Sequence, residues 1–250
     1  MIMPIIITNA LFAAAATFTV LLYLRRKLNF LTKTVSESGD AISEMVWTAR
    51  AIDAHVDATI SLPRPNGWTL DAAAIATLCQ ILENQRPRVV VELGSGLSTP
   101  IIGAAMKNHG GRLISVDHDR NFAETTRSYI NANGLQDVVE IRIAELQEIS
   151  SESRALWYDQ SALTDIHEID LLLIDGPPKP VDPMIRQHAL PFFLNKLAPS
   201  ATVILDDANR DGEKKIIDQW RTDYPVKDVQ VRGFPKSHAI ITLGNSRNSE

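Results

Sequence analysis

The sequence predicts an α/β fold, in which a mostly parallel sheet is covered by helices on both faces and closed by an antiparallel hairpin. After residue 68, strand-like apolar runs alternate with segments of helical length, which is the pattern of consecutive βαβ units. The last two strand-like runs, 226–232 and 237–243, are separated by only four residues. Parallel neighbours need about a dozen linking residues, so this final pair is predicted to be antiparallel.

The first predicted strand, 88–93, contains three consecutive valines, as expected of a parallel strand that is buried on both faces. Four further parallel strands are expected along the chain, and amphipathic helices fill the spaces between them. The later parallel strands are predicted at 112–117, 138–143, 169–175 and 201–206, and the helices at 70–83, 99–108, 121–133, 184–196 and 210–222.

The N-terminal segment predicts a transmembrane helix within residues 1–27. No charged residue occurs from Ile5 to Leu24, and twenty helical residues span about 30 Å, the thickness of the bilayer core. The basic run 25–27 follows at once, so the positive-inside rule predicts a single-pass protein in which residues 25–250 face the cytoplasm. A cleaved signal peptide is the alternative, but its positive charges would precede the apolar run.

Residues 28–67 are predicted to form a helical linker. A loose heptad of apolar residues extends over 28–59 and is interrupted at Gly39-Asp40. The stripe is expected to fold onto the domain, and pairing of two copies into a homodimer is the alternative. The proline-rich segment 63–67 ends the linker, and the domain is predicted to occupy 68–244, followed by a polar tail at 245–250.

Composition excludes some functions. The formal net charge is −5, and no basic stripe with interleaved aromatic residues is present, so a nucleic acid partner is not expected. Cys79 is the only cysteine, which excludes an internal disulfide and a cysteine-based metal site.

A glycine-rich turn follows the first predicted strand. Gly94 and Gly96 allow the backbone to approach a ligand closely, and Glu92 just before the turn suits a positively charged ligand. Thr99 stands where a dinucleotide-binding motif has its third glycine. Asp117 ends the second strand 23 residues after Gly94, where a carboxylate commonly binds a ribose diol. These features predict a nucleoside site that differs from the dinucleotide pattern.

In these residues the chain resembles the class I S-adenosylmethionine (SAM)-dependent methyltransferases, over about residues 68–243, and the resemblance implies their seven-stranded Rossmann-like sheet. By this resemblance, Gly94 and Gly96 approach the amino-acid part of SAM, Glu92 supports its ammonium group, and Asp117 binds both ribose hydroxyls. The complete set of cofactor-binding residues that it implies is Glu92, Gly94, Ser95, Gly96, Ser98, Asp117, His118 and Glu145. His118 is expected near the adenine, and Glu145 follows Ala144 where the family usually has Gly-Asp.

Carboxylates follow the fourth and fifth predicted strands: Asp175 ends one, and Asp206-Asp207 ends the next. Neighbouring parallel strands lie about 4.8 Å apart, so these three like charges are expected to meet. A hard cation such as Mg²⁺ or Ca²⁺ would neutralise them. This edge resembles the catechol-type metal-dependent O-methyltransferases, although Asp207 replaces an asparagine and Lys179 lies one residue later than their lysine base. Capping of the next helix is the plainer interpretation of Asp206-Asp207.

The sequence therefore predicts methyl transfer from SAM, most simply to a hydroxyl oxygen of a small-molecule, glycan or lipid-linked acceptor. Asp175 and Lys179 are the predicted catalytic residues, and Asp175, Asp206 and Asp207 the predicted metal ligands. The alternatives are a methyltransferase without a metal, a nicotinamide-dependent oxidoreductase on a similar sheet, and a non-catalytic membrane-tethered scaffold that binds SAM.

Overall fold

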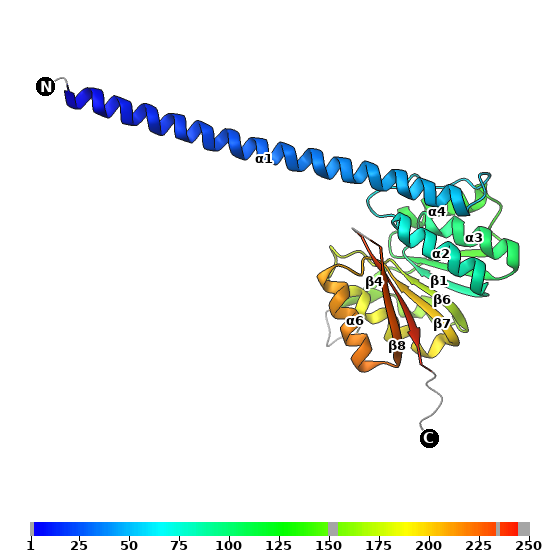
Figure 1. Ribbon diagram of the computed structural model, residues 1–250. Helices are drawn as coiled ribbons and strands as arrows, with labels where there is room; N and C mark the ends of the chain where they lie inside the picture. The colour runs from blue at the N-terminus through cyan, green and yellow to red at the C-terminus, as the bar shows by residue number, and fades with distance from the viewer. Residues whose placement is uncertain (1–2, 150–154, 234–235, 245–250) are drawn as a thin grey trace. The chain divides into compact units, whose positions relative to one another are not determined.

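The structure is a computed structural model that describes residues 3–149, 155–233 and 236–244 (Figure 1). The chain divides into two compact units, residues 1–46 and 47–250. The side chains of residues 3–20, 34, 37, 38, 41, 44, 45 and 55 lie outside the description. The predicted polar tail at 245–250 also lies outside the described residues.

Helix α1 extends without interruption over Met3–His55. The predicted break at Gly39-Asp40 is therefore wrong: a glycine inside an exposed helix costs only about 1 kcal/mol, which a long helix tolerates. Four apolar side chains of the predicted heptad are exposed, namely Leu28, Leu31, Val35 and Ile42. At the other end of the helix, Ile52 packs against a buried core cluster of the second unit. Pairing of the exposed stripe with a second copy stays a prediction.

The prediction of a transmembrane anchor is wrong for the part of the chain that the structure describes. No helix there is apolar enough over a sufficient length to cross a membrane. The described side chains of α1 begin at Leu21, and Arg25, Arg26 and Lys27 follow after only four residues. The side chains of the apolar run before Leu21, on which the prediction depended, lie outside the description. The predicted single-pass location with the domain facing the cytoplasm depended on this anchor and is therefore also wrong.

The second unit contains a seven-stranded mixed sheet with the strand order β3-β2-β1-β6-β7-β9-β8. Its strands are β1 (Val89–Leu93), β2 (Arg112–Asp117), β3 (Val139–Ile143), β6 (Ile169–Ile174), β7 (Leu197–Leu205), β8 (Val226–Arg232) and β9 (His238–Leu243). The first five pair in parallel, and β9 is antiparallel to both β7 and β8. The predicted parallel sheet with a C-terminal hairpin is confirmed.

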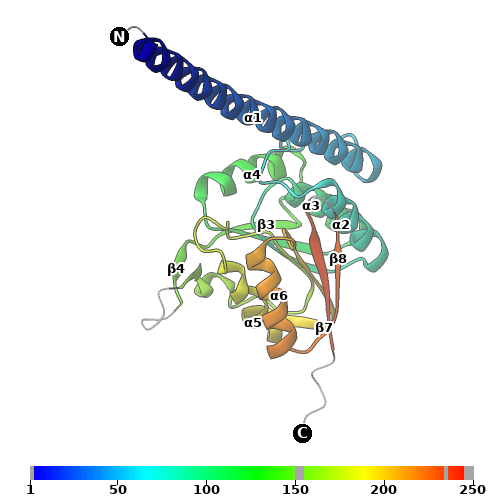
Figure 2. The same cartoon turned by 60° about the vertical axis from the view of Figure 1, so that its left-hand side comes forward.

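Helices cover both faces of this sheet (Figure 2). Buried apolar side chains form a separate core on each face. One face carries α2 (Ala72–Gln85), α3 (Ser98–His109) and α4 (Arg120–Ala132), and the other carries α5 (Ala189–Phe193) and α6 (Asp211–Asp223). Side chains alternate along each strand, so Val90 joins the first core and Val91 the second. Burial on both faces explains why these strands are almost entirely apolar.

Two local elements differ from the prediction. The expected helix at 184–196 is broken into η2 (Ile185–His188), α5 and η3 (Leu194–Lys196), and Pro191 within it lacks the amide hydrogen that a continuous helix needs. A short antiparallel ribbon of β4 (Leu146–Glu148) and β5 (Leu156–Tyr158) was not predicted.

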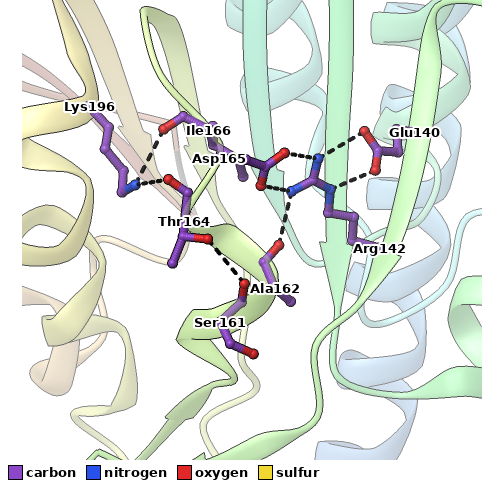
Figure 3. Close-up of polar contacts among 8 residues, drawn as sticks. All are labelled: Glu140, Arg142, Ser161, Ala162, Thr164, Asp165, Ile166 and Lys196. Carbon is purple, nitrogen blue, oxygen red and sulfur yellow. Dashed lines mark hydrogen bonds and ion pairs between the residues drawn. The ribbon is translucent and has the colours of Figure 1, made fainter.

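A polar cluster fixes the segment that leads into β6 (Figure 3). On β3, the guanidinium of Arg142 donates to both carboxylate oxygens of Asp165 at 2.6 and 2.9 Å and to those of Glu140 at 2.7 and 3.1 Å. Lys196 Nζ donates to the carbonyl oxygens of Thr164 and Ile166 at 3.0 and 3.3 Å. These bonds connect the segment before β6 to β3 and to η3. They thereby fix the position of β6 in the sheet and, with it, the position of its carboxyl end.

The two outer strands of the sheet carry charged side chains. Edge strand β3 contains Glu140 and Arg142, and edge strand β8 contains Lys227, Asp228 and Arg232. Most of β8 is exposed. The apolar surface is therefore concentrated on the inner strands.

Candidate active site

An open cavity of about 320 Å³ lies at the carboxyl ends of β1, β2, β6 and β7. This is the edge at which open α/β sheets bind ligands, and the volume falls within the usual range for small-molecule sites. Its lining includes the loop 94–98, residues 117–119, and the acids after β6 and β7. A larger hollow of about 910 Å³ lies among α2, α3 and the end of α4 and contains no strand end.

Glu92 near the end of β1 organises the glycine-rich loop from below. Its side chain is fully buried, and its carboxylate accepts hydrogen bonds from the hydroxyls of Ser98 (2.5 Å), Thr99 (2.6 Å) and Ser115 (2.6 Å). Burial raises the pKa of Glu92, and the three hydroxyl donors oppose that rise. Thr99 Oγ1 also accepts a bond from the Gly96 amide, so the loop is linked to the carboxylate through this hydroxyl.

Asp117 at the end of β2 holds the opposite side of the same loop. Its Oδ2 accepts bonds from the backbone N–H of Ser95 (2.9 Å) and from the Ser95 hydroxyl (2.7 Å), while Oδ1 accepts from the Asp119 amide. Burial alone would raise the pKa of Asp117, but hydrogen bonds from His118, Asp119 and Ser95 lower it below its ordinary value. Asp117 therefore presents an ionised carboxylate to the cavity.

The turns after β1 and β6 approach each other closely, and two glycines make this possible. Gly94 has φ +99°, and a Cβ placed on it would lie 3.1 Å from the carbonyl oxygen of Asp175. A Cβ on Gly176 would lie 2.5 Å from the Tyr158 hydroxyl. Gly96 differs, because a Cβ there meets no atom within 4 Å. Gly94 and Gly176 thus allow the two turns to approach each other, whereas Gly96 leaves space in the cavity lining.

The predicted acidic cluster forms: one carboxylate oxygen from each of Asp175, Asp206 and Asp207 lies within 4.8 Å of the others. Asp207 has φ +58°, an uncommon conformation for a non-glycine residue. Burial raises the pKa of Asp175 to about 6. Burial, reinforced by the negative charges of Asp175 and Asp207, raises the pKa of Asp206 well above its ordinary value. Oδ1 of Asp206 has no hydrogen-bond partner among the described residues.

A buried arginine that the sequence did not point to enters this cluster. Arg186, on η2, has a side chain that is only 4% exposed. Its Nη2 donates to the carbonyl oxygen (2.9 Å) and Oδ1 (3.2 Å) of Asp175. Its Nη1 donates to the Asp206 carbonyl oxygen (3.1 Å) and to Oδ2 of Asp207 (3.4 Å). Burial would lower the pKa of Arg186, but the surrounding carboxylates raise it, so the guanidinium is charged.

This arrangement fits a divalent cation poorly, even though the unpartnered Asp206 Oδ1 resembles a ligand. Two of the carboxylates that would bind the ion already accept from Arg186, and Asp207 Oδ2 also pairs with Arg210 at 2.5 Å. Unit charges about 4 Å apart interact by about 4 kcal/mol at an effective dielectric constant of 20, and a divalent ion doubles that repulsion. Binding of a metal ion at this cluster stays a prediction. Because the arginines oppose a divalent ion, no reaction step is assigned to a metal.

Most of the predicted site residues line the cavity: Gly94, Ser95, Gly96, Ser98, Asp117, His118, Asp175, Lys179, Asp206 and Asp207. Two do not. Glu92 is enclosed beneath the loop, and Glu145 is exposed outside the lining. Direct contact of Glu92 or Glu145 with a ligand in the cavity is therefore not supported by their placement.

Arg186 and Phe122 line the cavity and were not predicted from the sequence, and Trp68 lies in the same lining. Trp68 and Phe122 expose 64% and 55% of their surface, and large apolar side chains left exposed beside a cavity indicate ligand contact. The only available sequence signal for Arg186 was the need to balance three neighbouring carboxylates, which does not identify a particular arginine.

The fold is an α/β domain with a cavity at the carboxyl ends of its parallel strands. Residues 91–208 match a family model described as a methyltransferase domain. The family match and the fold support a Rossmann-like SAM-dependent methyltransferase.

Solved methyltransferase structures share the fold at low sequence identity. The O-methyltransferase TomG from Streptomyces achromogenes, in complex with SAM, is 17% identical, with a TM-score of 0.53 over 80% of this chain and 89% of its own. The SAH-bound methyltransferase PaMTH1 from Podospora anserina is 13% identical, with a TM-score of 0.52 over 81% and 87%. The O-methyltransferase from Bacillus cereus, in complex with S-adenosylhomocysteine (SAH), is 13% identical, with a TM-score of 0.50 over 79% and 90%. No curated protein sequence matches significantly.

Proposed function

We propose that this methyltransferase transfers the methyl group of SAM to a hydroxyl oxygen of a small-molecule acceptor, with glycan and lipid-linked alcohols included among the candidates. One observation carries the proposal: the glycine-rich loop and Asp117 meet the carboxylates of Asp175 and Asp206 in a single cavity. The loop and Asp117 suit a nucleoside cofactor, and the two carboxylates suit a hydroxyl that must lose a proton. Two of the solved structures that share the fold are described as O-methyltransferases.

In the proposed complex, the ribose hydroxyls of SAM bind Asp117, and its amino-acid part lies along Gly94–Gly96. Leu97 gives α3 no side-chain cap, so the first amides of this helix can receive the carboxylate of SAM. His118 lies beside Asp117 in the cavity lining and is proposed to flank the adenine. Glu92 acts in this scheme by fixing the loop through Ser98 and Thr99.

The proposed reaction is an in-line displacement. The acceptor oxygen attacks the methyl carbon, the bond between that carbon and sulfur breaks, and SAH leaves with the electron pair. The hydroxyl proton passes to a carboxylate of the cavity, for which Asp175 is the first candidate because it lies between the cofactor loop and Asp206. Lys179 lines the same cavity from an exposed position and is the alternative base. The protein contributes chiefly orientation and electrostatics.

The other functions have less support. A nicotinamide-dependent oxidoreductase would use the dinucleotide pattern, but Thr99 replaces its third glycine and donates to Glu92 instead. No observation favours that function. A scaffold that binds SAM without catalysis differs from the proposal only in turnover, so an assay must separate the two.

The test begins with calorimetric titration of the full chain with SAH, and with NAD⁺ as the competing cofactor. Release of SAH from SAM is then measured with phenols, sugars and lipid-linked alcohols as acceptors. The proposal expects SAH binding, no NAD⁺ binding, and turnover on a hydroxyl that Asp175→Asn removes while SAH affinity stays within about threefold. Turnover that survives Asp175→Asn but not Lys179→Ala would assign the base to Lys179. Folded protein that binds SAH yet acts only on amines, or on none of these acceptors, would contradict the proposal.

A further inference from the structure

The acidic cluster of the cavity contains its own counter-charge. Four acidic side chains gather behind and beside the acceptor end of the cavity: Asp175, Asp206, Asp207 and Glu213. Asp206, Asp207 and Glu213 are almost fully buried, and such a group of like charges requires a cation or protonation. Arg186 lies among them, with its Nη1 also 3.8 Å from Oε1 of Glu213.

The contacts of Arg186 connect the ends of β6 and β7. All three guanidinium nitrogens donate: Nε to the carbonyl oxygen of Pro177 at 3.3 Å, and the two Nη atoms to backbone and carboxylate oxygens of Asp175, Asp206 and Asp207. A planar guanidinium with five N–H donors suits several fixed oxygens at once, whereas a lysine ammonium does not. Arg186 thus holds both the carboxylates and the backbone segments after β6 and β7 that carry them.

We propose that Arg186 takes the place of a divalent cation at this carboxylate cluster, so that the enzyme needs no metal. The permanent charge of the guanidinium holds Asp175 and Asp207 in position. Arg186 is a positioning residue here, because it acts through the acids. Its role in holding Asp175, the proposed base, rests on the proposed function; the replacement of the metal does not.

The proposal predicts that removing the guanidinium creates a metal site. In Arg186→Met, the aliphatic volume is largely kept, but three neighbouring carboxylates lose their shared cation, and a divalent ion becomes the available replacement. Wild-type protein is expected to bind Mn²⁺ weakly or not at all. Arg186→Met is expected to bind Mn²⁺ at least about tenfold more tightly, because the repulsion from the guanidinium is gone.

A matched control is available on the edge strand β3. Arg142 also pairs with two acids, Glu140 and Asp165 (Figure 3), but it lies outside the cavity lining. Arg142→Met should lose stability without gaining affinity for Mn²⁺. A gain that appears only in Arg186→Met would therefore reflect the acidic cluster and not the general loss of an ion-paired arginine.

The experiment uses the full chain and Mn²⁺, with binding followed by electron paramagnetic resonance and melting temperature measured with and without the ion. Mn²⁺ should raise the melting temperature of Arg186→Met but of neither wild type nor Arg142→Met, and a chelator should leave wild-type SAH affinity unchanged. Stoichiometric Mn²⁺ binding by wild type that Asp206→Ala removes would overturn the proposal, even if Arg186→Met failed to fold. Folded Arg186→Met without any gain would overturn it as well. None of these readouts needs an acceptor, so failure of the proposed function would be seen separately, as absent turnover.

Discussion

Ser98 Oγ donates a 2.5 Å hydrogen bond to Oε1 of Glu92 and thereby joins the first turn of α3 to the end of β1. Thr99 and Ser115 donate to the other oxygen of the same carboxylate. Because Glu92 is fully buried, its influence on the cofactor must pass through these hydroxyls and the loop they hold. Glu92 thus supports the loop for which cofactor binding is proposed.

We expect Glu92→Ala to lower the free energy of unfolding by about 3 kcal/mol, since three buried hydroxyls lose their acceptor. Glu92→Gln should cost less than half as much, because the hydroxyls can reorient toward the amide, and SAH affinity should stay within about threefold. Urea unfolding and calorimetry measure the two quantities. If Glu92→Gln abolished SAH binding at unchanged stability, direct contact between Glu92 and the cofactor would be the better interpretation.

The two glycines of the loop should respond to alanine in opposite ways. Gly94→Ala places a Cβ at positive φ against the Asp175 carbonyl, so the free energy of unfolding should fall by about 2 kcal/mol. Gly96→Ala meets no neighbouring atom, so stability should hold or rise slightly, while SAH affinity falls about tenfold because the methyl group enters the cavity. Unaltered SAH affinity in Gly96→Ala would place the cofactor elsewhere.

Replacing the Asp117 carboxylate should weaken cofactor binding directly. Asp117→Asn keeps the shape of the side chain but loses the charge, and one oxygen acceptor is replaced by a donor that opposes the Ser95 amide. SAH affinity is expected to fall at least about tenfold, which represents roughly 1.4 kcal/mol. Asp170→Asn is the control, because Asp170 also accepts two backbone amides, those of Arg88 and Val89, but lies outside the cavity lining. Equal losses of SAH affinity in both variants would argue against a specific role for Asp117.

The buried His238 should make stability depend on pH. Burial lowers the pKa of His238 to about 4, and the positive charge of Arg232 contributes, whereas an unfolded histidine titrates near 6.5. The folded state thus binds the proton less tightly, so this contribution to stability is present above pH 6.5 and is lost as the pH falls toward 4. Compared with His238→Phe, wild type should lose up to about 3 kcal/mol over that interval. Urea unfolding at several pH values tests this, and parallel curves would contradict it.

Much of the sheet could be predicted because strands that are buried on both faces consist almost entirely of apolar residues, which form recognisable runs in the sequence. β2 and β8 match their predicted bounds, 112–117 and 226–232, and β9 differs by one residue. The three-residue strands β4 and β5 are too short to show a period. The break in the predicted helix at 184–196 was missed although Pro191 marks it, because the apolar spacing on either side continues the helical pattern.

The candidate site divides in the same way. Gly94, Gly96 and Asp117 could be placed at the cavity from the sequence because their placement depends on local positions at strand ends. Arg186 could not, because its partners lie 11, 20 and 21 residues away and meet it only through a short 3₁₀ turn. The surroundings of Glu92 could not be predicted for a related reason: a carboxylate at a strand end shows no sign in the sequence of the three hydroxyls that enclose it.

The charges on β3 and β8 bear on how this protein behaves at high concentration. An outer strand offers unpaired backbone groups to any other extended chain, and such contacts initiate aggregation. Lys227, Asp228 and Arg232 would have to lose water for a foreign strand to pair along β8, as Glu140 would along β3. Purified protein should therefore stay soluble at high concentration. Replacing these few charged side chains by neutral ones should be enough to cause precipitation.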